Sequence, residues 1–190
     1  MSNEQRPESA GLELATFAGG CFWCTEAVFK RVRGVSEVTS GYTGGKLVSP
    51  TYAQVSTGRS GHAEAIHVRF DPQAVSYERL LDVFWATHDP TTLDRQGADV
   101  GPQYRSAIFY HTEEQKRAAE ASRDRLQASS KLNGKIVTSI EPFEKFYPAE
   151  SYHQEYYEAH PHAAYCTIVI EPKIRKLLRD FGDEVKEEYK

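Results

Sequence analysis

Cys21 is the side chain in this sequence with the most distinctive chemical setting. It follows Gly19 and Gly20 in the run GGCFWC, between a β-prone segment and a segment with a helical pattern. A thiolate at a helix N-terminus faces unpaired backbone N–H groups and the positive end of the helix dipole, and both lower its pKa. Buried free cysteines are often inert, but an inert core thiol does not need two glycines before it. We therefore predict that Cys21 is a nucleophile.

Cys24 forms a C-x-x-C pair with Cys21, which also allows other chemistry. The pair could be a redox dithiol of the thioredoxin type, or it could be half of a zinc site. Zinc would need two more ligands, which Cys166 and either His160 or His162 could supply. Two bulky aromatic residues stand between the cysteines, where a zinc knuckle usually has small turn residues. We therefore expect no metal, and we keep the zinc-stabilised binding module and the general dithiol oxidoreductase as alternatives.

Glu64 is the candidate acid. It lies at the start of a β-prone segment, after Gly58, Gly61 and His62. In a strand it would point to the same face as the apolar residues at positions 66, 68 and 70. A carboxyl group on that apolar face would be desolvated, which raises its pKa toward neutrality and makes it a proton donor. A strand-end glutamate whose side chain bends toward water fits the pattern equally well.

Two tyrosines lie in predicted loops rather than in core elements. Tyr52 belongs to a long glycine-flanked loop, and Tyr104 follows a loop that contains Asp99. Phenolic O–H groups can bind a polar oxygen while their rings line an apolar pocket. Surface packing of the tyrosines and a turn role for the aspartate are the simpler interpretations.

Three histidines lie in the run YHQEYYEAHPH at positions 152–162. Their spacings of seven and two residues put no pair at i, i+4 on one helix face, which disfavours a metal site. We expect a capped, solvated helix end here.

The elements that must position these groups follow the order βαββαβ. Periodicity predicts strands at residues 12–18, 35–43, 63–70 and 105–111, a helix at 21–33, and a helix after an N-cap at Ser76. This is the order of the split βαβ, ferredoxin-like fold, with helices on one face of an antiparallel or mixed sheet. The sequence therefore predicts an α+β protein with a ferredoxin-like core.

The C-terminal part is predicted to add helices and loops to that core. A capping box at Thr112 and Gln115 begins a helix that runs to about Ser129. It is followed by a strand at 136–140, a loop at 141–150, a short helix at 151–160, a strand at 165–170 that holds Cys166, and a charged helix from 173 toward the C-terminus. We expect one domain over residues 12–190, and a disordered segment over residues 1–11.

Composition excludes several classes of protein. The net charge of −4 and the lack of a basic run disfavour nucleic-acid binding. No apolar run approaches the roughly 18 residues that a membrane span needs, and the first residues do not resemble a signal peptide. Three cysteines are too few for a disulfide scaffold. We expect a cytoplasmic, monomeric protein with free thiols.

Taken together, these motifs resemble the peptide methionine sulfoxide reductase A family, over about residues 17–172. The strongest matches are GGCFWC at 19–24, GYTGG at 41–45, PTYAQVSTGRSGHAEA at 50–65 and HDPTTLDRQGADVGPQYRSAIFY at 88–110. The resemblance implies reduction of the S epimer of methionine sulfoxide in proteins, with recycling by thioredoxin and no bound cofactor. Dithiothreitol is expected to replace thioredoxin as the external reductant.

The resemblance also implies roles for single residues. Cys21 matches the nucleophile, and Glu64 matches the acid that protonates the sulfoxide oxygen. Tyr52, Tyr104 and the nearby Asp99 match the network that holds this oxygen. Two further residues, Phe22 and Trp23, match the wall that accepts the substrate methyl group.

A second thiol must then condense with the sulfenic acid formed on Cys21 to give a disulfide. Cys166 matches a resolving cysteine that lies in a mobile, glycine-rich tail in several relatives, whereas here it opens the apolar run Thr-Ile-Val-Ile. Cys24, one helical turn from Cys21, is the alternative. We favour Cys166.

Overall fold

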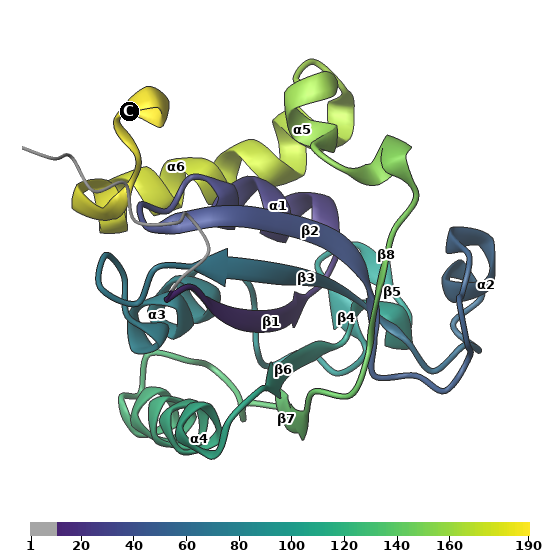
Figure 1. Cartoon of the computed structure of the whole chain (residues 1–190), viewed down its shortest axis with the longest axis horizontal. Coiled ribbons are helices and arrows are strands. Elements are labelled where there is room, and N and C mark those ends of the chain that lie inside the picture. Colours follow the sequence, from purple (N-terminus) through teal and green to yellow (C-terminus); the bar gives the residue numbers. More distant parts are fainter. Residues whose placement is uncertain (1–10) are drawn as a thin grey trace, which may run out of the picture.

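A six-stranded sheet forms the centre of the computed structural model, which describes residues 11–190 (Figure 1). Its strand order is β7-β6-β1-β3-β2-β8. The predicted disordered segment lies outside the described residues except for residue 11. The strands are β1 (Glu13–Gly19), β2 (Val35–Thr43), β3 (Ala63–Phe70), β6 (Ser106–Tyr110), β7 (Ser139–Pro142) and β8 (Phe146–Pro148).

The four predicted strands form the middle of this sheet in the order β6-β1-β3-β2, and each neighbouring pair is antiparallel. Helix α1 (Phe22–Lys30) joins β1 to β2, and helix α3 (Tyr77–Thr87) joins β3 to β6. Each helix returns the chain along the sheet, so the strands before and after it run in the same direction. β3 lies between β1 and β2, and β1 lies between β3 and β6. The α+β class is confirmed.

Side-chain parity along the strands separates two apolar layers. Phe17, Ile66, Val68 and Phe70 pack with α1 and α3 in the main core. The alternate positions carry small residues, such as Ala63 and Ala65, and form a thinner layer with Phe109 and the rings of Phe143 and Phe146. The apolar side chains of α3, among them Leu80, Leu81 and Phe84, are buried, and the predicted cap Ser76 accepts a hydrogen bond from the Arg79 N–H.

Residues 139–148 cross the alanine-lined face of the sheet from one edge to the other. This segment begins as β7, which pairs parallel to β6, and ends as β8, which pairs antiparallel to β2 (Figure 1). The crossing is tight at Gly41, where an added Cβ would lie 2.4 Å from the Phe146 ring. The sequence predicted a loop over 141–150, because a short edge strand that contains proline gives a weak strand pattern.

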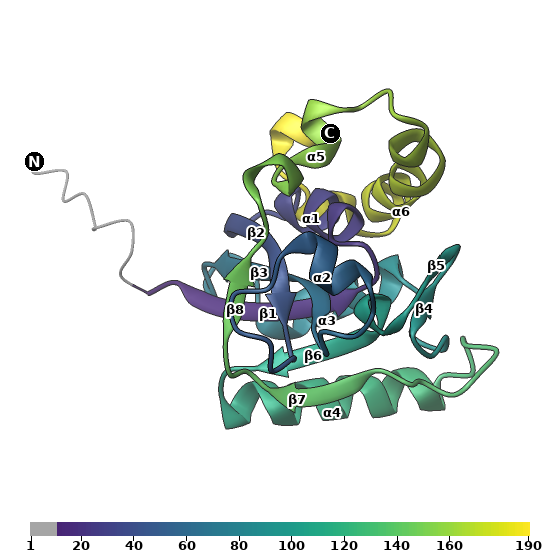
Figure 2. The same cartoon turned by 90° about the vertical axis from the view of Figure 1, so that its right-hand side faces the viewer.

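Two connecting segments with short elements of their own lie at the end of the sheet where β1 leads into α1 (Figure 2). The short helix α2 (Tyr52–Ser56) lies within the long loop before β3, and its capping box of Thr51 and Gln54 is a signal that the sequence prediction overlooked. The predicted loop after α3 contains a hairpin of β4 (Arg95–Gln96) and β5 (Asp99–Val100), followed by the 3₁₀ helix η1 (Pro102–Tyr104).

The C-terminal helices cover α1, α3 and β6. Helix α4 (Glu113–Ala128) begins at the predicted Thr112 cap and packs on α3 and β6, whereas α6 (Glu171–Phe181) packs on α1 and α3. The predicted helix at 151–160 is two short pieces, η2 (Ser151–His153) and α5 (Tyr156–Ala159), because Glu155 has a left-handed backbone with φ 54°. Short 3₁₀ turns, η4 (Gly182–Glu184) and η5 (Glu187–Tyr189), end the chain.

The predicted strand at 165–170 is wrong. Its residues form a π-helical segment, η3 (Cys166–Ile170), that continues into α6. The run Thr-Ile-Val-Ile has strong strand propensity, but Cys166, Ile170 and Ile174 recur every four residues and bury one helical stripe against α1. Tertiary packing therefore overrides local propensity in this segment.

We expect His88 to make the fold sensitive to acid. Its Nδ1–H donates to the Phe84 carbonyl (2.6 Å), its Nε2 accepts from the Ser106 hydroxyl (2.7 Å), and burial lowers its pKa to about 4. The unfolded chain binds a proton near pH 6.5, so this histidine's stabilisation is present above that pH and is lost as the pH falls toward 4. Urea unfolding should show that His88→Gln costs about 2 kcal/mol less at pH 5 than at pH 7. An equal cost at both pH values would contradict a neutral buried imidazole.

Candidate active site

The N-terminus of α1 positions Cys21 at the junction between strand and helix. Gly20 has φ 98°, and a Cβ at this position would lie 2.6 Å from the Gln96 side chain, so the turn requires glycine. Cys21 is the N-cap residue of α1 and is 8% exposed. The predicted order of strand, glycine turn and helix is therefore confirmed.

Glu64 reaches this helix start from β3. Its side chain is 2% exposed, and one carboxyl oxygen accepts a hydrogen bond from the Phe22 backbone N–H at 3.0 Å. Burial raises the pKa of Glu64 to about 8, and the negative charge of Asp99 adds to this, against the opposing effect of the Phe22 N–H. Glu64 is thus a buried, protonated carboxyl at neutral pH, and the alternative of a solvated strand-end glutamate is wrong.

Cys21 and Cys24 are buried together at the start of α1, and their thiols interact. Burial, together with the neighbouring Cys24 thiol and the charge of Glu64, raises the pKa of Cys21 well above its ordinary value. The interaction with the Cys21 thiol lowers the pKa of Cys24 to about 7. The expected low pKa of Cys21 is therefore wrong for the resting protein, because desolvation beside a carboxyl group outweighs the favourable helix N-terminus.

Tyr165 is a neighbour of these thiols that the sequence interpretation overlooked. Its hydroxyl donates to an Asp99 carboxylate oxygen (2.7 Å) and lies 3.6 Å from Cys24 Sγ. It lowers the pKa of both thiols, whereas burial raises its own pKa. The sequence predicted a strand for the segment that carries Tyr165. It therefore gave no sign that this hydroxyl lies between Asp99 of β5 and Cys24 of α1.

Tyr52 and Tyr104 approach the same place from two different elements. Tyr52 begins α2, and Tyr104 ends η1 and packs against the buried cysteines. Burial raises the pKa of both phenols, and the charges of Glu64, Cys21 and Asp99 raise it further. Both hydroxyls therefore remain protonated at neutral pH and can donate hydrogen bonds.

Aromatic rings surround the helix start on its other side. Phe22 is 1% exposed, whereas Trp23 is half-buried and stacks on Tyr156 with ring centroids 3.6 Å apart. The ring of His153 lies 5.2 Å from Phe22 and 4.3 Å from Tyr52, measured between centroids. The prediction of a solvated helix end is wrong for His153, which is buried.

Cys166 lies beneath these groups rather than on a mobile tail. It is fully buried and belongs to the apolar cluster that contains Cys21, Cys24, Ala27 and Ile170. All three cysteines are free thiols. The structure thus gathers every cysteine of the chain around the first turn and a half of α1.

Two general features concern the described part of the chain. Within residues 11–190, no three His, Cys, Asp or Glu side chains are grouped so that they could hold a metal ion. No helix in this range is both long and apolar enough to cross a membrane.

Comparison with known proteins identifies the family to which this site belongs. The family profile described as peptide methionine sulfoxide reductase matches residues 13–185. The chain belongs to the peptide methionine sulfoxide reductase family. Peptide methionine sulfoxide reductase MsrA of Thermus thermophilus is 57% identical over 170 residues, which cover 89% of this chain and 95% of that relative.

Solved structures that superpose on this chain have a similar fold. The reduced form of Mxr1 from Saccharomyces cerevisiae superposes with a TM-score of 0.76 at 32% identity, over 87% of this chain and 95% of Mxr1. A second crystal structure shows Mxr1 in complex with Trx2, and it superposes with a TM-score of 0.54 at 25% identity, over 82% of this chain and 92% of that chain.

Removing the Tyr165 hydroxyl should raise the thiol pKa at this site. In Tyr165→Phe, the site loses the hydroxyl that lowers the pKa of both thiols, because the single proton of this hydroxyl can turn from Asp99 to Cys24 once Cys24 is a thiolate. The first thiol to titrate should therefore do so at higher pH than in the wild type. Thiolate absorbance in the ultraviolet as a function of pH measures this. Tyr110→Phe, outside the cysteine cluster, is the control. A titration curve identical to that of the wild type would show that the hydroxyl does not act on these thiols.

Proposed function

We propose that this protein reduces L-methionine S-sulfoxide, in peptides and as the free amino acid, to L-methionine, and so repairs oxidised proteins. The observation that carries the proposal is the meeting of the Cys21 thiol with the buried, protonated Glu64 at the start of α1. A sulfoxide oxygen is a poor leaving group unless it is protonated. A neutral carboxyl beside a thiol supplies the proton that this reaction needs.

In the proposed first step, Glu64 donates its proton to the sulfoxide oxygen while the sulfur of Cys21 attacks the sulfoxide sulfur. This attack forms a transient S–S bond. The protonated oxygen then moves to the sulfur of Cys21 as the substrate S–O bond and the transient S–S bond break, so methionine leaves and Cys21 carries the oxygen as a sulfenic acid. The thiol proton of Cys21 returns to the carboxylate of Glu64. Methionine sulfoxide is reduced by two electrons, and the cysteine is oxidised by two.

The surrounding groups fit the binding of the same substrate. We propose that the hydroxyls of Tyr52 and Tyr104 hold the sulfoxide oxygen within the network of Asp99, and that Phe22 and Trp23 enclose the methyl group. The raised phenol pKa values support this role, since a protonated phenol donates a hydrogen bond to a developing negative charge. Selection of the S epimer is part of the same proposal.

Recycling requires a second thiol to condense with the sulfenic acid, which forms a disulfide and releases water. We propose Cys166 as this resolving cysteine, with Cys24 as the alternative. The position of Cys24 one helical turn from Cys21 favours Cys24, whereas Cys166 packs in the same buried cluster as both. Thioredoxin would then reduce the disulfide, which the complex of the related Mxr1 with Trx2 supports.

The remaining parts of the proposal concern the protein as a whole. Electrons come from thioredoxin, or from dithiothreitol in the test tube, so the reaction needs no bound cofactor. Three free thiols fit a reducing compartment, and we propose a monomer of the cytoplasm. We also infer one catalytic domain over residues 12–190 with a ferredoxin-like core, which the antiparallel order β6-β1-β3-β2 supports.

The activity should depend strongly on the carboxyl proton of Glu64. The reduced protein, with dithiothreitol, should convert the S epimer and not the R epimer of a methionine sulfoxide peptide, as followed by mass spectrometry. Glu64→Gln cannot donate this proton and should lower kcat/KM by roughly 10²–10⁴-fold. Glu26→Gln, which alters another buried carboxyl group, within α1 itself, is the matched control. Full activity in Glu64→Gln would instead favour a general dithiol oxidoreductase.

The resolving cysteine can be identified from recycling alone. If Cys166 resolves, Cys166→Ser should reduce about one equivalent of substrate and then stop with thioredoxin, whereas Cys24→Ser should turn over repeatedly. Peptide mapping of the oxidised wild type gives the disulfide directly. Thioredoxin-dependent turnover of Cys166→Ser at the wild-type rate would transfer the role to Cys24.

A further inference from the structure

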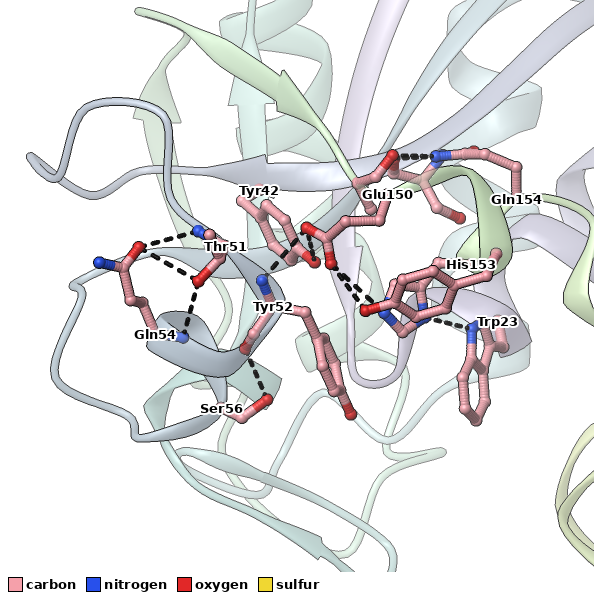
Figure 3. Close-up of polar contacts among 12 residues, drawn as sticks. Trp23, Tyr42, Thr51, Tyr52, Gln54, Ser56, Glu150, His153 and Gln154 are labelled. Atoms are coloured by element: carbon pink, nitrogen blue, oxygen red, sulfur yellow. Dashed lines mark hydrogen bonds and ion pairs between the residues drawn. The ribbon is translucent and has the colours of Figure 1, made fainter.

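His153 connects the indole of Trp23 to the carboxylate of Glu150 (Figure 3). The Trp23 Nε1–H donates to His153 Nδ1 at 3.2 Å, and His153 Nε2 lies 3.8 Å from Glu150 Oε2. The imidazole is almost completely buried, with 3% of its side chain exposed. The imidazole thus lies between the indole, to which it is hydrogen-bonded, and the carboxylate, which it faces.

The indole donor fixes the protonation of the imidazole. An indole nitrogen can only donate, so His153 Nδ1 must be the acceptor and the single proton of the neutral ring lies on Nε2. Within residues 11–190, Nε2 has no hydrogen-bond partner, and it faces the negative charge of Glu150. A doubly protonated ring would lose the acceptor for Trp23, and burial, which lowers the pKa of His153, favours the neutral form.

Glu150 also holds the elements on the other side of the histidine. One of its oxygens accepts hydrogen bonds from the backbone N–H of Tyr52 (3.2 Å) and the hydroxyl of Tyr42 (3.5 Å). The other accepts from the Tyr152 hydroxyl at 3.0 Å. One carboxylate therefore joins the start of α2, strand β2 and the η2 turn that carries the histidine (Figure 3).

The ring of His153 lies among the aromatic side chains of the site. Its centroid lies 5.2 Å from that of Phe22, 5.7 Å from that of Trp23 and 4.3 Å from that of Tyr52. Tyr156 stacks on Trp23, which fixes the plane of the indole but not the direction of its N–H, because a half-turn of χ2 keeps the ring in the same plane. The hydrogen bond to His153 fixes that direction.

We propose that His153 and Glu150 are positioning residues that fix the indole of Trp23 relative to Tyr52, and so set the shape of the wall against which the substrate methyl group binds. The part concerning substrate rests on the proposed function. The hydrogen bond between Trp23 and His153 can itself be tested in the resting protein.

The sequence contains two tryptophans, which provides an internal control. The Nε1–H of Trp85 donates to the Ser122 hydroxyl at 2.8 Å, in contact with α4 and outside the site. In ¹H–¹⁵N spectra of the full chain, His153→Phe keeps an aromatic ring but offers no acceptor. It should shift the indole N–H signal of Trp23 and leave that of Trp85 in place, and Ser122→Ala should do the reverse. An unchanged Trp23 signal in His153→Phe would overturn the proposal.

Kinetics separate positioning from simple structural support. Loss of one such hydrogen bond should raise KM for a methionine S-sulfoxide peptide about two- to tenfold in His153→Phe, with kcat for dithiothreitol-driven turnover within about twofold of the wild type. Glu150→Gln, which keeps an acceptor oxygen but loses the charge, should have a smaller effect in the same direction. An unchanged KM in His153→Phe would overturn the positioning role.

Two outcomes keep the proposal separate from the function on which it rests. If the wild type does not reduce methionine sulfoxide, the proposed function fails. The indole signals still decide whether the hydrogen bond between Trp23 and His153 is formed. If His153→Phe does not fold, the ¹⁵N shifts of the histidine rings in the wild type decide the same point. The Nε2–H form of His153 supports the proposal, and the Nδ1–H form overturns it.

Discussion

The hydrogen bond from the Phe22 backbone N–H to the carboxyl group of Glu64 is the contact on which the site depends. It joins the first turn of α1 to β3 and satisfies one of the N–H groups that every helix start leaves unpaired. It also fixes the acid beside the thiol of Cys21, because that residue immediately precedes Phe22. Both groups are buried, so small displacements of helix against sheet would change their separation directly.

Burial of several ionisable groups in one place gives the resting site its electrostatic character. Glu64 and Cys21 are both desolvated, and the charge of Glu64 raises the pKa of Cys21 while the charge of Cys24 raises that of Glu64. Asp99 adds to this effect, and it is held by the hydroxyl of Tyr165. The favoured resting state therefore has a neutral carboxyl on Glu64 and a neutral thiol on Cys21.

The central strands and the helices α1, α3 and α4 could be predicted because each has a strong periodic pattern or a cap, such as Ser76 for α3 and Thr112 for α4. The positions of Cys21 and Glu64 could be predicted for the same reason. His153 and Tyr165 could not, since both lie in C-terminal segments that come to α1 through long-range packing. The stripe of Cys166, Ile170 and Ile174 was hidden within β-branched neighbours, and the left-handed Glu155 interrupted a pattern that suggested one continuous helix.

The segment that crosses the alanine-lined face of the sheet also determines how the sheet meets other chains. Its two ends, β7 and β8, are the outermost strands, with four and three residues respectively. Each ends in a proline, Pro142 or Pro148, which cannot donate a hydrogen bond to an incoming strand. Short edge strands that end in proline disfavour pairing with strands of other molecules. Because residues 139–148 supply both edge strands, this one segment disfavours aggregation at both edges of the sheet.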